Sequence, residues 1–259
     1  MIGETGVGKS SFCNTIIGQG HDAKVFPVSF SNYSVTHATT IENRYYKNDR
    51  SRPIRVIDTQ GFNDPGSTIN QKHHDYEIQA ELLNKLGEVD GVHRFIICVN
   101  ATNPRVPPSL VKMIETFLNA YGYRLEGEKK VTDHEEFWKR CVINFTRFSF
   151  NEEVMINRRK ARESKAQIEH KTQEKLEMLF GFGAQGLEHF FIDSHYSKSN
   201  PEENERFHEE TERLYLLLLT KSAARSYALK IALKRAETLS LPGHTNLRSH
   251  PYKDKGTLR

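Results

Sequence analysis

The chain has 259 residues, a net charge of +4 and 37 % hydrophobic residues. This length suits a single α/β domain with a small appendage, because domains rarely exceed about 250 residues. The mean hydropathy is −0.64, and the longest strongly apolar run is only 214–219. A membrane-spanning helix is therefore excluded, since it needs about 20 apolar residues. Basic and acidic residues are interleaved, a pattern that gives no support for nucleic acid as a partner.

The three cysteines, Cys13, Cys98 and Cys141, form no C-x-x-C pair. Cys98 and Cys141 lie in apolar, strand-like runs, so we expect buried, reduced thiols rather than metal ligands. The chain opens almost directly into a glycine-rich motif, and we expect no secretory signal. Together these features predict a cytoplasmic location.

Apolar runs alternate with helical patterns along the chain, which is typical of βαβ units around a mostly parallel sheet. The predicted class is therefore α/β. We expect strands over residues 54–58, 95–99, 141–145 and 189–193. We expect helices over residues 10–17, about 71–86, about 108–121, 152–180 and 202–219.

The predicted helix over 152–180 is unusually long and is rich in Arg, Lys and Glu. One interpretation is a solvated helix stabilised by pairs of opposite charge four residues apart. The other is a protruding helix that contacts a partner. The sequence leaves both open.

Residues 3–10 read GETGVGKS and match the phosphate-binding motif G-x-x-x-x-G-K-[ST] in full. Its glycines let the backbone curl so that successive N–H groups face a phosphate. Lys9 would reach the β- and γ-phosphates, and the Ser10 hydroxyl would bind Mg²⁺. The residues that we expect to hold the nucleotide here are Gly3, Glu4, Thr5, Gly6, Val7, Gly8, Lys9, Ser10 and Ser11.

A P-loop normally follows a central strand, but only Met1 and Ile2 precede this one. Losing a central strand would leave its two neighbours without ladder hydrogen bonds. We therefore expect the natural chain to carry the strand, and this sequence to start inside it.

A second motif, D-x-x-G, follows the predicted strand 54–58 and consists of Asp58, Thr59, Gln60 and Gly61. It places a carboxylate next to the water shell of Mg²⁺ and a glycine N–H within reach of a γ-phosphate. The two motifs together favour a GTPase-type switch over a small-molecule kinase, although neither reads the base.

Four segments together resemble a known family: GETGVGKSSFCNTIIG, SVTHATT, VIDTQGFND and HRFIICVNATNPRV. They resemble the AIG-type G domain of the immunity-associated (GIMAP) family, in the septin- and Toc-like branch of P-loop GTPases. The resemblance runs over residues 1–220. It implies a three-layer α/β/α sandwich that binds GTP or GDP with Mg²⁺. It also implies a homo-dimer or homo-oligomer formed through the nucleotide face.

The resemblance further implies a first switch around residues 34–40. Thr36 best matches the family's threonine that senses Mg²⁺ and the γ-phosphate, so Ser10, Thr36 and Asp58 form the expected metal set. Thr39 and Thr40 lie close enough to remain alternatives.

The guanine-selecting loop departs from the family pattern. Thr146 and Arg147 match it, but Ser149 stands where the family has an aspartate. A hydroxyl cannot replace a bidentate carboxylate, so guanine and adenine both stay open. Arg147 could still stack on the base, or a neighbouring acidic group could take the place of the aspartate. A backbone N–H at Ser194 is a further expected contact with the base.

The catalytic residues also depart from the common pattern. Phe62 stands just after the glycine, where many GTPases carry a water-orienting glutamine. We therefore expect slow hydrolysis, with Lys9 and Gly61 holding the phosphates. The resemblance implies that a dimer supplies the missing group, and Arg105 is the candidate arginine in trans.

We divide the chain into a G domain (1–220), a C-terminal helix (221–239) and a disordered tail (240–259). The helix is basic on one face, which suits either a membrane surface or packing on the G domain. The predicted function is a GTP/GDP-binding switch or oligomerising scaffold with slow hydrolysis. The alternatives are a non-hydrolysing nucleotide-binding module with relaxed base choice and an ATP-using P-loop protein.

Overall fold

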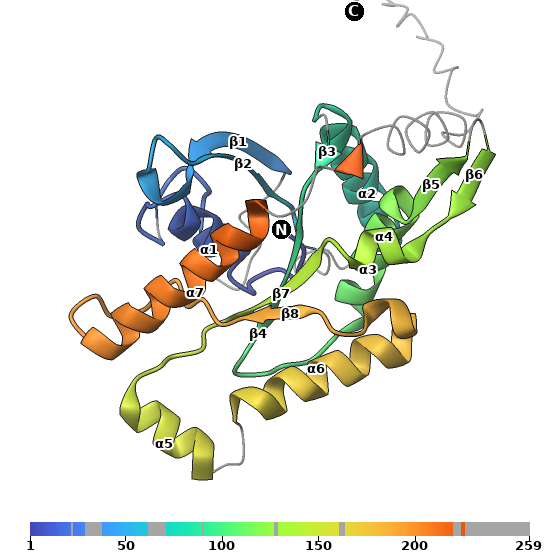
Figure 1. The fold of residues 1–259 in the computed structure, drawn as a ribbon. Helices are drawn as coiled ribbons and strands as arrows, with labels where there is room; N and C mark the ends of the chain where they lie inside the picture. Colours follow the sequence, from blue (N-terminus) through green and yellow to red (C-terminus); the bar gives the residue numbers. More distant parts are fainter. Residues whose placement is uncertain are drawn as a thin grey trace, which may run out of the picture.

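The computed structural model describes residues 1–21, 23–28, 38–61, 71–89, 91–126, 129–160, 164–219 and 224–225 (Figure 1). Its helices are α1 (Lys9–Ile16), α2 (Gln71–Gly87), α3 (Pro108–Tyr121), α4 (His134–Trp138), α5 (Glu152–Lys160), α6 (Lys165–Phe180) and α7 (Pro201–Leu219), with 3₁₀ turns at Tyr46–Asn48 and Phe182–Ala184. Its strands are β1 (Thr40–Tyr45), β2 (Pro53–Asp58), β3 (Gly91–Val92), β4 (Phe95–Asn100), β5 (Tyr123–Glu126), β6 (Lys129–Thr132), β7 (Cys141–Thr146), β8 (Glu188–Phe190) and β9 (Ala224–Arg225).

The centre of the sheet consists of β4, β7 and β8, which are parallel. Every residue of β7 is buried, and so is every residue of β4 except Asn100. This is expected of parallel strands that helices cover on both faces. At the other side of the sheet β1 and β2 pair antiparallel, with Thr40 opposite Asp58. The prediction of a mostly parallel α/β sheet is confirmed.

Met1 and Ile2 lie between β2 and β4, where the P-loop motif predicts a strand. Ile2 donates its N–H to the carbonyl of Ile96 at 2.8 Å and accepts from the N–H of Cys98 at 2.7 Å. On the other side, the Met1 amine donates to the carbonyl of Ile57 at 2.6 Å. These two residues therefore connect the antiparallel pair to the parallel strands and fix where the P-loop begins.

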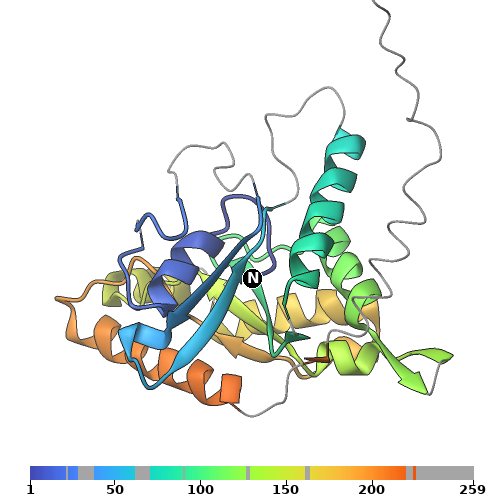
Figure 2. The same cartoon turned by 90° about the horizontal axis from the view of Figure 1, so that it is seen from above.

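Two hydrophobic cores lie on opposite faces of the sheet. Alternate residues of β4 face opposite ways, so Ile96 and Cys98 enter one core while Ile97 and Val99 enter the other. The first core is covered by α1 and α7, and the second by α2, α3 and α6 (Figures 1 and 2). The expected three-layer α/β/α sandwich is therefore present.

The prediction of one helix over 152–180 is wrong. The structure has two helices there, α5 and α6, with residues 161–163 outside the described part. Ser164 starts α6 through a capping box: its hydroxyl accepts from the N–H of Gln167, while the Gln167 side chain accepts from the N–H of Ser164. Ile168, Thr172 and Leu176 are buried, so α6 packs on the core along one face rather than protruding.

Other boundaries also differ from the prediction. The strand expected over 189–193 ends at Phe190, because no partner continues the ladder beyond Asn144 in the described chain. Ala224 and Arg225 pair with Val92 and Gly91 as strand β9. The prediction of a helix over 221–239 is therefore wrong at residue 224, which pairs with β3 as a strand. Most of that segment, its suggested membrane role and the predicted tail lie outside the described residues. None of the helices in the described ranges is long and apolar enough to cross a membrane.

His189 of β8 is a partly buried base beside two cations. Burial lowers its pKa from 6.5 to about 4, and the charges of Arg213 and Lys165 act in the same direction. Its Nε2 is buried without a hydrogen-bond partner among the described residues. The folded state therefore holds a neutral imidazole that the unfolded chain would protonate below about pH 6.5.

We predict that His189→Gln flattens the acid side of the stability profile. Because the folded pKa lies below the unfolded one, the wild type keeps this contribution above pH 6.5 and loses it as pH falls towards 4. Partial exposure limits the loss to about 1 kcal/mol between about pH 7.5 and about pH 5. Thermal melts at both values should show a smaller drop for His189→Gln than for wild type. The control, His170→Gln on the exposed face of α6, should drop like wild type, and an equal drop in all three would contradict the assignment.

Candidate functional site

The P-loop curls around its own lysine. Gly6 and Gly8 have φ of 75° and 97°, values that residues other than glycine rarely adopt. Lys9 is the first residue of α1, and its side chain folds back over the loop. Its Nζ donates to the carbonyls of Gly3 at 2.9 Å and Glu4 at 2.8 Å. This fixes the loop as a ring that ends at the N-terminus of α1, the arrangement that binds phosphate in P-loop proteins.

Lys9 and Asp58 are two buried groups of opposite charge that influence each other through space. Burial lowers the pKa of the Lys9 ammonium, and the Asp58 carboxylate opposes that shift. Burial likewise raises the pKa of Asp58, and Lys9 opposes it. Each charge therefore stabilises the ionised form of the other in a place where neither would be stable alone.

The side chains of Ser10 and Asp58 form a set that fits Mg²⁺. The Ser10 hydroxyl donates to Asp58 Oδ2 at 2.6 Å. The other oxygen, Oδ1, is buried and has no hydrogen-bond partner among the described residues. A hydroxyl, a carboxylate and water are ligands that this hard cation prefers, together with phosphate oxygens. In the described part of the chain, no three His, Cys, Asp or Glu residues gather in a way that could hold another metal.

The D-x-x-G segment lies directly against the P-loop. The Gly61 backbone approaches Thr5 so closely that a Cβ at Gly61 would lie 2.3 Å from the Thr5 nitrogen. Thr59 holds the same segment in place, because its hydroxyl donates to the carbonyl of Met1 at 2.6 Å. Gly61 is therefore needed for steric reasons, and the two motifs expected to meet at a γ-phosphate do meet.

The loop after β7 also contacts the P-loop. The Thr146 hydroxyl donates to the carbonyl of Val7 at 2.7 Å. Arg147 adopts a left-handed backbone with φ of 58°, and its guanidinium donates to the carbonyl of Gly6 at 2.8 Å. Both residues, expected from the sequence to contact the nucleotide, thus hold the outer side of the phosphate loop through side-chain hydrogen bonds.

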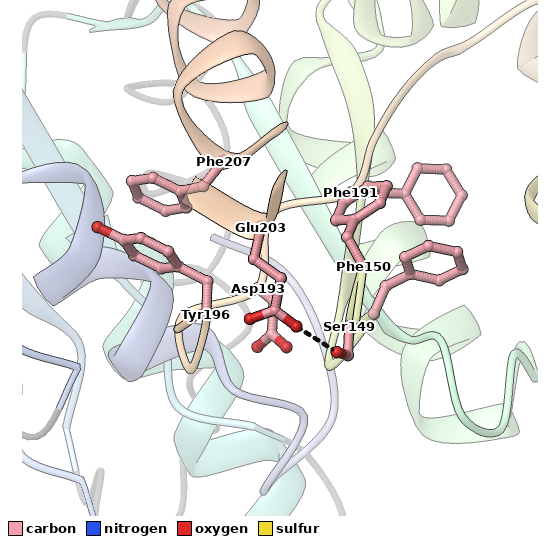
Figure 3. Close-up of a pocket in the computed structure, with 8 residues that line it drawn as sticks. Ser149, Phe150, Phe191, Asp193, Tyr196, Glu203 and Phe207 are labelled. Carbon is pink, nitrogen blue, oxygen red and sulfur yellow. Dashed lines mark hydrogen bonds between the residues drawn. The ribbon is translucent and has the colours of Figure 1, made fainter. Parts of the chain in front are cut away.

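Beyond Arg147, Ser149 faces a buried carboxylate that the sequence analysis did not single out. The Ser149 hydroxyl donates to Oε1 of Glu203 at 2.8 Å (Figure 3). The N–H of Ser197 donates to Oε2 of the same carboxylate at 2.7 Å. Ser149, Asp193 and Glu203 line one pocket, with the rings of Tyr196 and Phe207 stacked beside them. Glu203 lies in the acidic first turn of α7, and only the fold brings it to Ser149.

The predicted contact at Ser194 lies next to this pocket. Ser194 is buried, and its hydroxyl has no hydrogen-bond partner in the described ranges. The adjacent Asp193 accepts from the N–H of His195 at 3.0 Å. The two loops expected to enclose the base, after β7 and after β8, are therefore neighbours.

The structure describes only some of the predicted switch residues. Thr36 and Phe62 lie outside the described residues. Of the alternatives, Thr39 donates its N–H and its hydroxyl to the Glu81 carboxylate, at 3.2 and 3.0 Å. Thr40 is the first residue of β1, opposite Asp58. Thr39 therefore ties the segment before β1 to α2.

Arg105 lies in the loop between β4 and α3, and Glu4 of the P-loop contacts the start of α3. Arg105 is exposed, and Glu4 accepts a 2.5 Å hydrogen bond from Ser109 in the first turn of α3. The P-loop side chain thus touches the helix that follows this loop. An exposed arginine here is accessible to a second molecule.

The P-loop follows the parallel bridge of Ile2 with β4, the loops after β7 and β8 follow parallel strands, and the D-x-x-G segment follows β2. Helices cover both faces of this sheet. This arrangement defines the G-domain fold of P-loop GTPases. Residues 1–122 match the model of the AIG1 family. The resemblance to the AIG-type G domain that was stated from the sequence is therefore confirmed over residues 1–122.

Solved structures with this fold include Toc33 from Arabidopsis thaliana. The Toc33 structure in complex with GDP and Mg²⁺ has a TM-score of 0.55 at 16 % identity, covering 86 % of this chain and 84 % of that chain. The Toc33 structure with Mg²⁺ and GMPPNP has a TM-score of 0.53 at 17 % identity, covering 86 % and 85 %. At this identity the likeness shows the fold alone. No curated protein sequence matches the chain.

We predict that Gly61→Ala abolishes tight nucleotide binding while leaving the protein folded. The added Cβ would press on backbone at Thr5 and force the two phosphate-facing segments apart. Titration with a fluorescent guanine nucleotide should show an affinity loss of at least about tenfold. Gly186→Ala is the matched control: its φ is 67° and its Cβ meets nothing within 4 Å. It should cost about 1 kcal/mol of stability and leave binding unchanged. Binding by Gly61→Ala equal to wild type would contradict this role.

Proposed function

We propose that this protein binds GTP and GDP with Mg²⁺ and works as a slow GTPase of the switch or oligomerising-scaffold type. The observation that carries the proposal is the joint geometry of two motifs. Ser10 of the P-loop bonds to Asp58, the charge of Asp58 acts on Lys9, and the Gly61 backbone lies against Thr5 of the P-loop. Toc33, which shares the fold, was solved with GDP and Mg²⁺, and this supports the same ligands here.

The residues of the chain have separate roles in this proposal. The backbone N–H groups of residues 3–10 and the N-terminus of α1 would face the phosphates. The Lys9 ammonium would exchange its two carbonyl partners for phosphate oxygens, which carry more charge. Ser10 would bind Mg²⁺ directly, and Asp58 would hold one of its waters through Oδ1. When bound, the metal neutralises charge that develops on the phosphates. The Gly61 N–H would face the γ-phosphate.

The first test is a titration of the full chain with labelled GDP and labelled ADP in Mg²⁺ buffer. We expect micromolar binding of GDP, and Lys9→Ala should weaken it by at least about tenfold. Lys175→Ala, an exposed lysine on α6, is the matched control for loss of a positive charge. A circular dichroism melt verifies that each variant is folded.

The outcomes separate the rival functions. No binding by the folded wild type, or binding that Lys9→Ala leaves unchanged, would contradict the proposed function. Preference for ADP would favour the ATP-using alternative. Equal binding of both nucleotides would favour a nucleotide module with relaxed base choice.

The slow-hydrolysis part of the proposal rests on Phe62 and on self-association. An apolar side chain after the D-x-x-G glycine cannot orient water, so the isolated monomer lacks this group. For Toc33 and psToc159, dimerisation is described as important for GTPase activity. We propose that this chain also dimerises through its nucleotide face, with exposed Arg105 reaching the partner's phosphates.

We predict that phosphate release per chain rises with protein concentration, because the dimer supplies the missing charge. Arg105→Ala should lower the rate at high concentration at least about tenfold while leaving GDP affinity unchanged. Arg140→Ala, on the turn after α4, is the control for loss of an arginine. A rate independent of concentration would contradict the dimer, and no release at any concentration would favour the non-hydrolysing module.

A further inference from the structure

We propose that Ser149 and Glu203 together select guanine in place of the family's aspartate. The Ser149 hydroxyl accepts the N1–H of the base, and the Glu203 carboxylate fixes the direction of that hydroxyl. This inference rests on the proposed function, and it specifies how the same site recognises its base.

The hydrogen bonds that Ser149 makes within the described chain leave one lone pair of its hydroxyl oxygen without a donor. A hydroxyl carries one proton and two lone pairs. The proton goes to Glu203 Oε1 at 2.8 Å, and one lone pair accepts the N–H of Asn151 at 3.1 Å. Among the contacts that the described chain makes, the second lone pair is unused. The side chain is half-buried, so this lone pair is what it can offer to a ligand.

Glu203 is held rigidly enough to keep that orientation. It is 6 % exposed, and its Oε2 accepts from the N–H of Ser197 at 2.7 Å. Its own N–H donates to the Asn200 side chain at 3.2 Å, which fixes the start of α7. Both carboxylate oxygens act as acceptors, so Glu203 cannot donate a proton back to Ser149. Figure 3 shows the carboxylate and the hydroxyl meeting in the pocket beside Asp193.

The position of Ser149 is that of a base reader. It follows Arg147, which is anchored to the carbonyl of Gly6 in the P-loop. It also shares its pocket with Asp193, in the loop after β8. Guanine carries a proton on N1, whereas N1 of adenine is an acceptor. A hydroxyl whose only proton is committed to a carboxylate can pair with the first and not with the second.

This mechanism differs measurably from the usual one. An aspartate accepts from both N1–H and the exocyclic amine, whereas Ser149 has a single lone pair for N1–H. Inosine has N1–H and lacks the amine. IDP should therefore bind wild type within about threefold of GDP, and ADP should bind at least about tenfold more weakly than GDP.

The test measures GDP, IDP and ADP binding to wild type and to Glu203→Gln. A glutamine amide can donate to Ser149, and the hydroxyl can then give its proton to N1 of adenine. The GDP-to-ADP ratio should fall to less than about threefold. Glu202→Gln, an exposed neighbour in the same turn, is the matched control and should keep the wild-type ratio. Ser149→Ala should also lose the ratio, and it covers the case in which Glu203→Gln fails to fold.

Two sets of outcomes keep this inference apart from the proposed function. If wild type binds no nucleotide, or binds independently of Lys9, the proposed function fails and this inference fails with it. If wild type binds in a Lys9-dependent way, the inference alone is tested. It is overturned when folded Glu203→Gln or Ser149→Ala keeps the full ratio, when wild type binds GDP and ADP equally, or when only Asp193→Asn removes the ratio.

Discussion

The site depends on a buried ammonium at the start of α1. Removing Lys9 from water carries a large desolvation cost. Two P-loop carbonyls offset part of this cost through hydrogen bonds, and the charge of the Asp58 carboxylate offsets a further part. The carbonyls belong to the P-loop and the carboxylate to the end of β2, and the hydrogen bond from Ser10 to Asp58 joins these two segments directly. The contact of Gly61 with Thr5 and the bonds of Met1 and Ile2 to β2 and β4 follow from the same approach. Phosphate oxygens would satisfy the same ammonium. The buried charge that shapes the P-loop would therefore also bind a nucleotide.

Charge and hydrogen bonding extend this arrangement outward from the phosphate loop. Thr146 and Arg147 bond to the carbonyls of Val7 and Gly6, so the loop after β7 is positioned by the P-loop itself. On the opposite side, the Thr39–Glu81 contact ties the segment before β1 to α2. The phosphate loop itself contacts the loop after β7 through Val7 and Gly6, and it contacts the D-x-x-G segment where Thr5 lies against Gly61. A ligand at its centre touches elements whose positions already depend on one another.

The central site was predictable because its determinants are local. Glycines with positive φ, a lysine at a helix start and a carboxylate at a strand end give short, recognisable patterns, and the structure brings Lys9, Ser10, Asp58 and Gly61 together. The break between α5 and α6 was also readable, since Ser164 and Gln167 form the S-x-x-Q pattern of a capping box. Strand β1 was missed because its residues are mostly polar and none of them is buried, as is common in edge strands. The pairing of Ser149 with Glu203 joins segments 54 residues apart, and nothing local marks Glu203 among the acidic residues of α7.

The proposed base site shows why a substitution has to be judged with its neighbours. Taken alone, serine in place of aspartate removes a charge and one acceptor, and a loss of base selection is the natural interpretation. In the fold, Glu203 supplies a carboxylate beside Ser149, and the Ser149 hydroxyl would act as an acceptor towards a base because its proton goes to that carboxylate. Selection between guanine and adenine would then depend on whether the Ser149 hydroxyl donates its proton to Glu203 or to the base, and not on the number of charges near the base. The same reasoning explains the phosphate end, where the donors of Lys9 are satisfied by carbonyls of its own loop. At both ends, the hydrogen bonds made within the protein determine what the site has left to offer a nucleotide.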